Sequence, residues 1–217
     1  AAFAPPVAVA AAARSYAVAK RSPDVVDSLA LLALALPPLP LIAVLVRLDS
    51  PGPIVFRQPR IGRGGRLFYF YKFRTMQVDA RAKFPELYSY RYTREQFLDM
   101  LDKSPSDPRL TRLGRKLRTT SLDELPNLLN VLRGEMSLVG PRPELPDVIG
   151  YYSDAELVKF SVRPGVTGLW QVSGRSSLRK SQQLEVDQEY VRRRSFRYDV
   201  SILARTAKVV LLRIGAF

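Results

Sequence analysis

The chain has 217 residues, 47% of them hydrophobic, which suits one domain or one domain with a small appendage. Lysine and arginine outnumber the acids 34 to 20, and the formal charge of +14 indicates phosphate-bearing partners or an anionic membrane surface. The sequence has no cysteine and no histidine. Disulfides, thiolate or imidazole metal sites and Ser-His catalysis are therefore excluded, and any acid, base or nucleophile must be Asp, Glu, Lys, Tyr, Ser or Thr.

Residues 1–19 are Ala-rich without a clear apolar period, and we expect a mobile or weakly helical lead there. A signal peptide fits poorly because Lys20 and Arg21 follow this stretch, whereas the charges of a signal precede its apolar part. A remnant of a longer membrane-spanning region stays open as another interpretation of these residues.

An uncharged run, SLALLALALPPLPLIAVLV, extends from Ser28 to Val46. It is nearly as long as a spanning helix, which needs about 20 apolar residues. Pro37, Pro38 and Pro40 lie in its middle, where each proline removes an amide donor and clashes with the preceding turn. We therefore predict two helices with a bend at Pro37 and Pro38.

Each half of this run is too short to cross a membrane by itself. The first half, 28–36, would rise only about 14 Å at roughly 1.5 Å per residue, against a hydrocarbon core of about 30 Å. A helix-break-helix over 20–49 that dips into one leaflet and returns would keep both basic flanks on the same, cytoplasmic, face. A kinked spanning helix and a buried hairpin of a soluble protein are the alternatives.

The rest of the chain, 50–217, reads as one mixed α/β domain that is mainly helical. The expected elements are a β-hairpin around 62–65, interrupted helix over 78–103, a loop at 104–109, a helix over 122–133, a strand at 136–140, a strand at 167–174, a polar helix over 178–193 and an amphipathic helix over about 196–213. Packing on the core and lying on a membrane both suit the last helix.

Two adjacent acids, Asp123 and Glu124, open the helix predicted over 122–133, which Gly134 would end. Ser121 and Glu124 match the capping-box pattern, which accounts for the glutamate structurally. Asp123 would lie in the first turn, where free amides and the helix dipole keep a carboxylate ionised. An acid pair there suits a hard divalent cation such as Mg²⁺, and a carboxylate is also a nucleophile toward phosphorus.

Phosphoryl chemistry depends on positioning and charge neutralisation, so cations should converge on such a site. Arg118 approaches the acid pair along the chain, and Arg142 lies between two prolines that restrict its loop. Arg163 and Arg175 lie beside turn glycines, where the backbone can come close to a ligand. Lys72 is an isolated cation in an aromatic strand. For any one arginine, a solvated surface charge is the alternative.

Several stretches together resemble one family, the bacterial sugar transferases, also called monotopic phosphoglycosyl transferases. They are KRSPD, DSPGPIVFRQPRIGRGG, FYKFRTM, SLDELP, GPRP and VRPGVTGLWQVSGR, and the resemblance covers the chain from about residue 20 to 217. The segment between Met76 and Asp107 resembles the hexose-1-phosphate members, with glucose or galactose as the expected sugar. Such members usually bend their membrane segment at a Ser-Pro pair, whereas Leu36 precedes Pro37 here.

The resemblance implies an enzyme that transfers a sugar 1-phosphate from a UDP-sugar to a polyprenyl (undecaprenyl) phosphate with Mg²⁺ and releases UMP. Asp123 would be the nucleophile that forms a covalent phosphosugar intermediate, and Glu124 would help to hold the metal. Phosphate and nucleotide binding is implied for Arg118, Pro141, Arg142, Pro143, Arg175 and Lys72.

The resemblance also implies a place in the cell, on the cytoplasmic face of the bacterial inner membrane. There the re-entrant segment 20–49 would enter the anionic leaflet and the domain 50–217 would stay outside the bilayer, with amphipathic helices on the surface. Such an enzyme would catalyse the first membrane step of exopolysaccharide, O-antigen or glycoconjugate assembly, and a homo-oligomer stays open.

Two other classes of protein compete with this interpretation. A membrane-anchored, basic nucleic-acid-binding protein would cluster its Lys and Arg with exposed aromatics, but only 192–194 form an arginine run here. A membrane scaffold without catalysis leaves the acid pair and GPRP unexplained. We therefore expect no nucleic acid among the partners.

Overall fold

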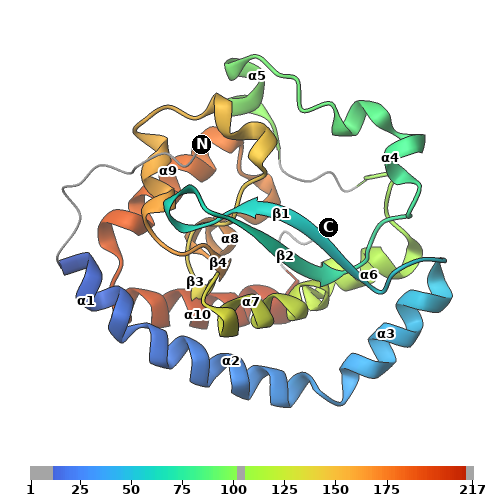
Figure 1. Ribbon diagram of the computed structural model, residues 1–217, viewed down its shortest axis with the longest axis horizontal. Helices are drawn as coiled ribbons and strands as arrows, with labels where there is room; N and C mark the ends of the chain where they lie inside the picture. Colours follow the sequence, from blue (N-terminus) through green and yellow to red (C-terminus); the bar gives the residue numbers. More distant parts are fainter. Residues whose placement is uncertain (1–11, 102–105, 214–217) are drawn as a thin grey trace.

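The computed structural model describes residues 12–101 and 106–213, which form mostly helices around two small β-sheets (Figure 1). The helices are α1 (Ala12–Ala19), α2 (Arg21–Ala35), α3 (Pro38–Asp49), α4 (Ala80–Lys83), α5 (Arg94–Asp99), α6 (Arg112–Thr120), α7 (Leu128–Arg133), α8 (Leu169–Ser173), α9 (Lys180–Arg193) and α10 (Phe196–Leu211). The strands are β1 (Val55–Ile61), β2 (Leu67–Phe73), β3 (Ser137–Val139) and β4 (Gly165–Thr167). The predicted fold class, mixed α/β and mainly helical, is confirmed.

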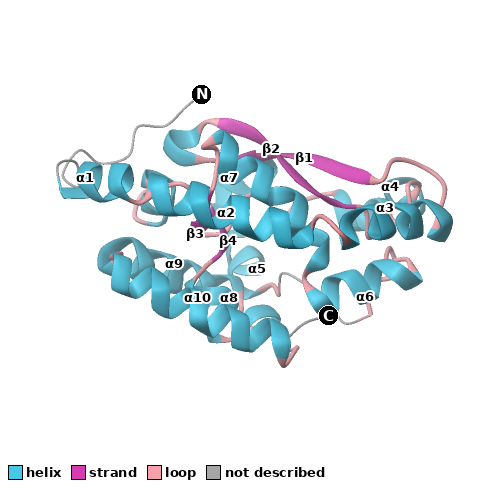
Figure 2. Cartoon of the chain, turned by 90° about the horizontal axis from the view of Figure 1, so that it is seen from below, coloured by secondary structure: helices cyan, strands magenta, loops and turns pink. Residues whose placement is uncertain are grey.

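The elements are arranged in two layers. Figure 2 shows β1, β2, α2 and α7 on one side of the molecule and α8, α9 and α10 on the other, with β3 and β4 between them. The main core fills the space between the layers with side chains from both, among them Phe68, Phe70, Leu128, Val131, Met136, Leu138, Val139, Leu169, Tyr190, Val191 and Ile202. The two halves of the chain therefore share one core.

The N-terminal helices form a bent pair. α1 and α2 follow one another as one nearly continuous helix, Ser15–Ala35, and α3 follows it at an angle of 65°. The break is at Leu36 and Pro37, and Pro38 is the first residue of α3, where its missing N–H would have no helical partner anyway. The predicted bend at Pro37 and Pro38 is confirmed. The expected mobile lead falls partly on residues 1–11, outside the described chain.

No described helix could cross a membrane alone, whereas the bent pair is long and apolar enough when both its parts are counted. Many of its large apolar side chains are exposed, namely Val26, Leu29, Leu31, Leu34, Leu36, Leu41, Val44, Leu45 and Leu48. The other face of α3 is buried, where Ile42 and Val46 pack with Phe73 and Leu117. This exposed surface contradicts the alternative of a buried soluble hairpin.

Polar side chains fix the start of α2 to the domain body. Lys20 Nζ donates a hydrogen bond to the Val139 carbonyl at 2.7 Å, and the Asp24 carboxylate accepts one from the Leu138 amide at 3.1 Å. Arg21 donates to carbonyls near the end of α7. These contacts hold the bent pair against β3.

The β-hairpin is formed as predicted, with β1 and β2 antiparallel and Phe56 opposite Lys72. The region 78–103, expected to be interrupted helix, contains the short helices α4 and α5 and a 3₁₀ turn at Pro85–Tyr88. Part of the predicted loop at 104–109 lies outside the described residues.

The helix predicted over 122–133 is α-helical only in its second half. Leu122–Asn127 is a 3₁₀ segment, and α7 begins at Leu128. Pro126, inside the 3₁₀ segment, has no amide to donate, which disfavours a regular α-helix there. Gly134, at φ 80°, ends α7 as predicted.

The strand predicted over 167–174 is wrong. Its partner β3 has only three residues, and the parallel pairing uses 165–167, so the ladder ends where the prediction begins. The residues after Gly168 form α8, which buries Trp170 at 4% exposure. The strand around 136–140 and the helices over 178–193 and about 196–213 are confirmed as β3, α9 and α10.

Gly114 of α6 lies so close to the end of β2 that an added Cβ would overlap the Thr75 carbonyl. We expect Gly114→Ala to lower the free energy of unfolding by about 1–3 kcal/mol, because the backbone contact cannot give way as a flexible side chain would. Denaturant unfolding in detergent measures this. Gly150→Ala is the control, since nothing lies within 4 Å of its added Cβ; equal stability of the two variants would contradict the prediction.

Candidate active site

The predicted acid pair follows a sharp turn at the end of α6. Ser121 adopts the left-handed conformation (φ 59°, ψ 12°), which costs about 1–3 kcal/mol for a residue other than glycine and which clusters at functional sites. Its hydroxyl accepts a hydrogen bond from Arg175 Nη2 at 2.8 Å and does not cap the following turn. The predicted capping box is therefore wrong. The turn carries Asp123 into the protein, where it is only 4% exposed.

Glu124 contacts the loop that follows β3. Its carboxylate accepts a hydrogen bond from Arg142 Nη2 at 3.0 Å in an ion pair that is largely shielded from solvent. Pro141 and Pro143, on both sides of the arginine, are buried. Because the prolines restrict the backbone, Arg142 is held toward the acid pair.

The same loop is anchored at its far end by Glu144. The Glu144 carboxylate contacts Lys159 Nζ at 3.0 Å and Lys180 Nζ at 2.7 Å, and all three residues are buried. Burial alone would raise the pKa of Glu144, but the two lysines hold it well below its usual range. The loop is thus tied to the protein on both sides of Arg142.

Arg118 points from α6 toward β2 and the acid pair. Its Nε donates to Thr75 Oγ1 at 3.1 Å, and its Nη1 lies 3.9 Å from an Asp107 oxygen. Asp107 is itself paired with Arg109 at 2.8 Å. Burial lowers the pKa of Arg118, and the charges of Asp123 and Asp107 partly offset that effect.

Lys72 on β2 is half-buried and lies over the Phe70 ring, 5.3 Å from its centroid. Arg142 lies over the same ring at 5.8 Å. Loss of hydration lowers the pKa of Lys72 to about 7, although Glu124 and Asp123 favour its charged form. Titratable groups with such shifts cluster at functional sites.

Most of the cations singled out from the sequence meet at the acid pair. Burial lowers the pKa of Arg175, which lies within electrostatic range of Glu124, Arg142 and Asp123. Arg163 is the exception, because its Nε donates to the Gly134 carbonyl at 2.9 Å and its charged neighbours are other residues. The cluster contains Lys72, Arg118, Asp123, Glu124, Arg142 and Arg175.

Sequence reasoning missed the residues that position these cations. Thr75 and Asp107 hold Arg118, Ser121 holds Arg175, and Phe70 lies under two cations. Ser121 was singled out, but as a helix cap. Asp107, in a turn between prolines, offers no local signal for an ion pair with a helix that follows it.

The acid pair suits Mg²⁺ as part of a shared coordination shell. Asp123 and Glu124 offer hard carboxylate oxygens, and Mg²⁺ is commonly bound by one or two carboxylates together with water and substrate phosphates. Within 12–101 and 106–213, acids do not gather in the groups of three or more that a complete protein cage would need. The donor set thus fits an ion that a phosphate ligand helps to hold.

The site as a whole combines two acids with four cations in a partly desolvated cluster, which suits a ligand that carries several phosphate charges. The model of one family, described as bacterial sugar transferase, matches residues 15–213. The chain belongs to the bacterial sugar transferase family.

Relatives of this sugar transferase include proteins whose names contain undecaprenyl phosphate. The chain is 41% identical over 206 residues to the undecaprenyl-phosphate galactose phosphotransferase of Salmonella typhimurium, covering 95% of this chain and 43% of the relative. It is 40% identical over 206 residues to the UDP-glucose:undecaprenyl-phosphate glucose-1-phosphate transferase of Caulobacter vibrioides, covering 91% and 72%.

A third relative is the exopolysaccharide production protein ExoY of Rhizobium meliloti, 38% identical over 200 residues, with coverage of 92% and 88%. Several of the relatives are longer, and the chain spans only about two fifths of their length, between 37% and 43%. The names of these three relatives refer to sugar transfer or polysaccharide production and not to nucleic acid.

The lowered pKa of Lys72 makes the stability of this transferase depend on pH. Below pH 7 the lysine is charged in both the folded and the unfolded state, so burial of that charge lowers the free energy of unfolding. Between pH 7 and 10.5 the lysine of the folded state is neutral while that of the unfolded state is still charged. The destabilisation by Lys72 therefore decreases as the pH rises through this range. We expect Lys72→Met to be more stable than the parent at pH 6, by on the order of 1–2 kcal/mol after discounting for solvent screening.

This advantage should shrink as the pH rises toward 10. Denaturant unfolding of both proteins across this range measures it, with the exposed Lys208→Met as the control for loss of a lysine. A Lys72→Met protein that is less stable than the parent at pH 6 would contradict the prediction.

Proposed function

We propose that this sugar transferase moves a sugar 1-phosphate from a UDP-sugar to a membrane polyprenyl phosphate, such as undecaprenyl phosphate, and releases UMP. The observation that carries the proposal is the position of Asp123, a buried carboxylate beside Glu124 and within reach of Arg118, Arg175 and Lys72. The names of the Salmonella and Caulobacter relatives support the reaction class.

The reaction consists of two displacements at one phosphorus atom. In the first, an Asp123 carboxylate oxygen bonds to the phosphorus that bears the sugar, the bond from that phosphorus to the UMP oxygen breaks, and UMP leaves with the electron pair. In the second, an oxygen of the polyprenyl phosphate bonds to the same phosphorus, and the bond to Asp123 breaks. The products are UMP and a polyprenyl diphosphate sugar, and the Asp123 carboxylate is restored.

The surrounding side chains bind and orient the phosphates. Arg142 is aimed by its proline-bound loop and by its pair with Glu124, and Arg118 and Arg175 are fixed by hydroxyls. Their charge opposes the charge that develops on the phosphoryl oxygens. Asp123 and Glu124 would hold Mg²⁺, which would neutralise phosphate charge and favour the departure of UMP.

The bent pair α2–α3 supports a position on the cytoplasmic face of the bacterial inner membrane. Its exposed apolar side chains suit a re-entrant segment that enters one leaflet of an anionic membrane, and its contacts with β3 keep that segment near the acid pair. A soluble nucleotide sugar and a lipid phosphate can meet at such a boundary. Relatives named for galactose and glucose favour a hexose donor for exopolysaccharide synthesis.

Replacement of the proposed nucleophile tests the mechanism. We expect Asp123→Asn to reduce UMP release from UDP-glucose or UDP-galactose, with polyprenyl phosphate and Mg²⁺, by at least about a thousand-fold, because an amide does not form the covalent intermediate. The matched control is Asp147→Asn, which removes an exposed carboxylate and should leave turnover near that of the parent.

A second measurement follows the intermediate itself. The parent incubated with a donor labelled in the sugar phosphate, without lipid acceptor, should retain label after denaturation, and Asp123→Asn should not. Robust turnover by Asp123→Asn would refute the covalent mechanism, and a parent that releases no UMP from any of a panel of UDP-sugars would refute the proposed function.

A further inference from the structure

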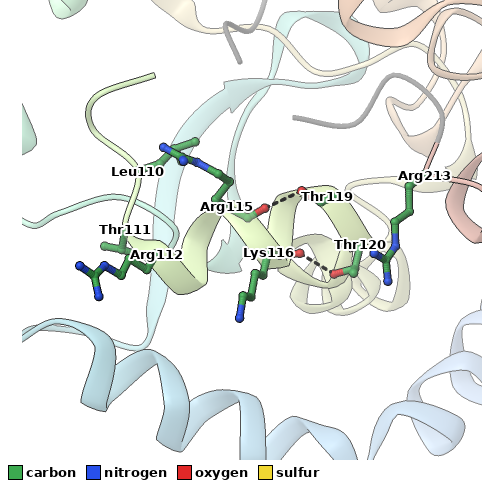
Figure 3. Close-up of a pocket in the computed structure, with 8 residues that line it drawn as sticks. All are labelled: Leu110, Thr111, Arg112, Arg115, Lys116, Thr119, Thr120 and Arg213. Carbon is green, nitrogen blue, oxygen red and sulfur yellow. Dashed lines mark hydrogen bonds between the residues drawn. The ribbon is translucent and has the colours of Figure 1, made fainter. Parts of the chain in front are cut away.

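A second cationic surface lies on α6, apart from the acid pair. A hollow in the surface is lined by Leu110, Thr111, Arg112, Arg115, Lys116, Thr119, Thr120 and Arg213 (Figure 3). Four of these residues are cations and none is an acid. Within the described part of the chain, the side chains of Arg112, Arg115, Lys116 and Arg213 make no ion pair or hydrogen bond, and only the backbone carbonyls of Arg115 and Lys116 accept from a side chain. We call this surface the α6 pocket.

Two of the three hydroxyl groups in the α6 pocket are already used as donors, and the third, that of Thr111, accepts from the Gly114 amide. Thr119 donates to the Arg115 carbonyl at 2.8 Å, and Thr120 donates to the Lys116 carbonyl at 2.9 Å. An anion in the pocket would therefore be bound mainly by the guanidinium and ammonium groups, which suits a phosphate more than a neutral polar molecule.

The α6 pocket lies on a different face of the helix from the groups that serve the active site. Arg118 and Gly114 face Thr75 at the end of β2, whereas Leu113 and Leu117 pack with α3. At 100° per residue, the pocket side chains of α6 occupy the remaining arc of the helix surface. A ligand in the pocket would thus lie on a different side of α6 from Arg118.

The α6 pocket also lies close to the apolar surface of the bent pair. α6 packs against α3, whose Leu41, Val44, Leu45 and Leu48 are exposed. In Figure 3 the charged ends of Arg112, Lys116 and Arg213 point to the side of α6 on which the bent pair lies, whereas that of Arg115 points to the opposite side. Cations in such a place lie at the depth of lipid headgroups if the apolar surface enters the leaflet.

We propose that the α6 pocket binds the phosphodiester headgroup of an anionic phospholipid of the bilayer. This inference rests on the proposed membrane position of the transferase, but not on its covalent chemistry. The substrate lipid phosphate is the less suitable occupant, because Arg118 and the acid pair face away from the pocket and the substrate must reach them. A bound headgroup would hold α6, and hence Arg118, at a fixed height above the leaflet.

Vesicle binding by charge variants of the full chain tests this. The vesicles are phosphatidylcholine with or without phosphatidylglycerol, at equal total lipid. We expect Arg112→Gln with Lys116→Gln to reduce the partition coefficient onto phosphatidylglycerol vesicles roughly 30-fold, and to change binding to pure phosphatidylcholine little. The control is Arg63→Gln with Arg66→Gln, an equal loss of charge at two exposed residues in the β1–β2 turn, for which we expect a loss of less than about 3-fold.

Equal losses in the two double variants would overturn the proposal, because they would show attraction by net charge without a site. A third set of vesicles contains polyprenyl phosphate in place of phosphatidylglycerol. If the pocket variant loses affinity only for those vesicles, the pocket binds the substrate lipid and the proposal is wrong.

Turnover in neutral detergent keeps this test separate from that of the enzyme mechanism. UMP release by the pocket variant should equal that of the parent there, which also shows that the variant is folded. If the parent releases no UMP but its binding to phosphatidylglycerol vesicles still depends on the pocket, the proposed function is wrong and the lipid site is supported. If turnover is normal but the pocket variant binds these vesicles as the parent does, only the lipid site is wrong.

Discussion

The ion pair between Glu124 and Arg142 is the contact on which the candidate site depends. It joins the 3₁₀ segment after α6 to the loop after β3. Because the pair is largely shielded from water, removal of either partner would leave the other charge buried without its hydrogen-bonded partner. The buried pairs of Glu144 with Lys159 and Lys180 fix the other end of the loop. The acid pair and the cations around it therefore hold one another in place.

The same loop connects the site to the N-terminal bent pair. Lys20 and Asp24 bind the backbone of β3 at Val139 and Leu138, directly before the residues that lead to Arg142. A displacement of α2 would thus act on the strand that precedes the loop containing Arg142. If the bent pair enters the membrane as proposed, this connection would set the distance between the bilayer and Asp123.

Local sequence patterns predicted the elements whose causes are local. Runs of β-branched and aromatic residues on both sides of a glycine-rich turn predicted the hairpin, and the prolines at 37 and 38 predicted the bend. The errors arise where distant contacts compete with a local pattern. Ser121 and Glu124 match the sequence pattern of a capping box, but the Glu124 carboxylate binds Arg142, which is 18 residues away. The Ser121 hydroxyl binds Arg175 instead. The strand predicted around Trp170 fails because its partner β3 is too short to extend the ladder.

Electrostatics explain why this cluster suits a compact ligand with several phosphate charges better than an extended nucleic acid. Sites for single-stranded nucleic acid follow the backbone with a positively charged groove, whereas burial here lowers the pKa of Lys72, Arg118 and Arg175, which lie near Asp107, Asp123 and Glu124. The protein therefore keeps desolvated positive charge that its own carboxylates do not fully compensate. A diphosphate, as in the proposed donor, would supply the missing negative charge, and the electrostatic cost of the empty site would then become part of the binding free energy. Binding of such a ligand would explain why the cations lie so close together, although the protein has enough exposed surface to separate them.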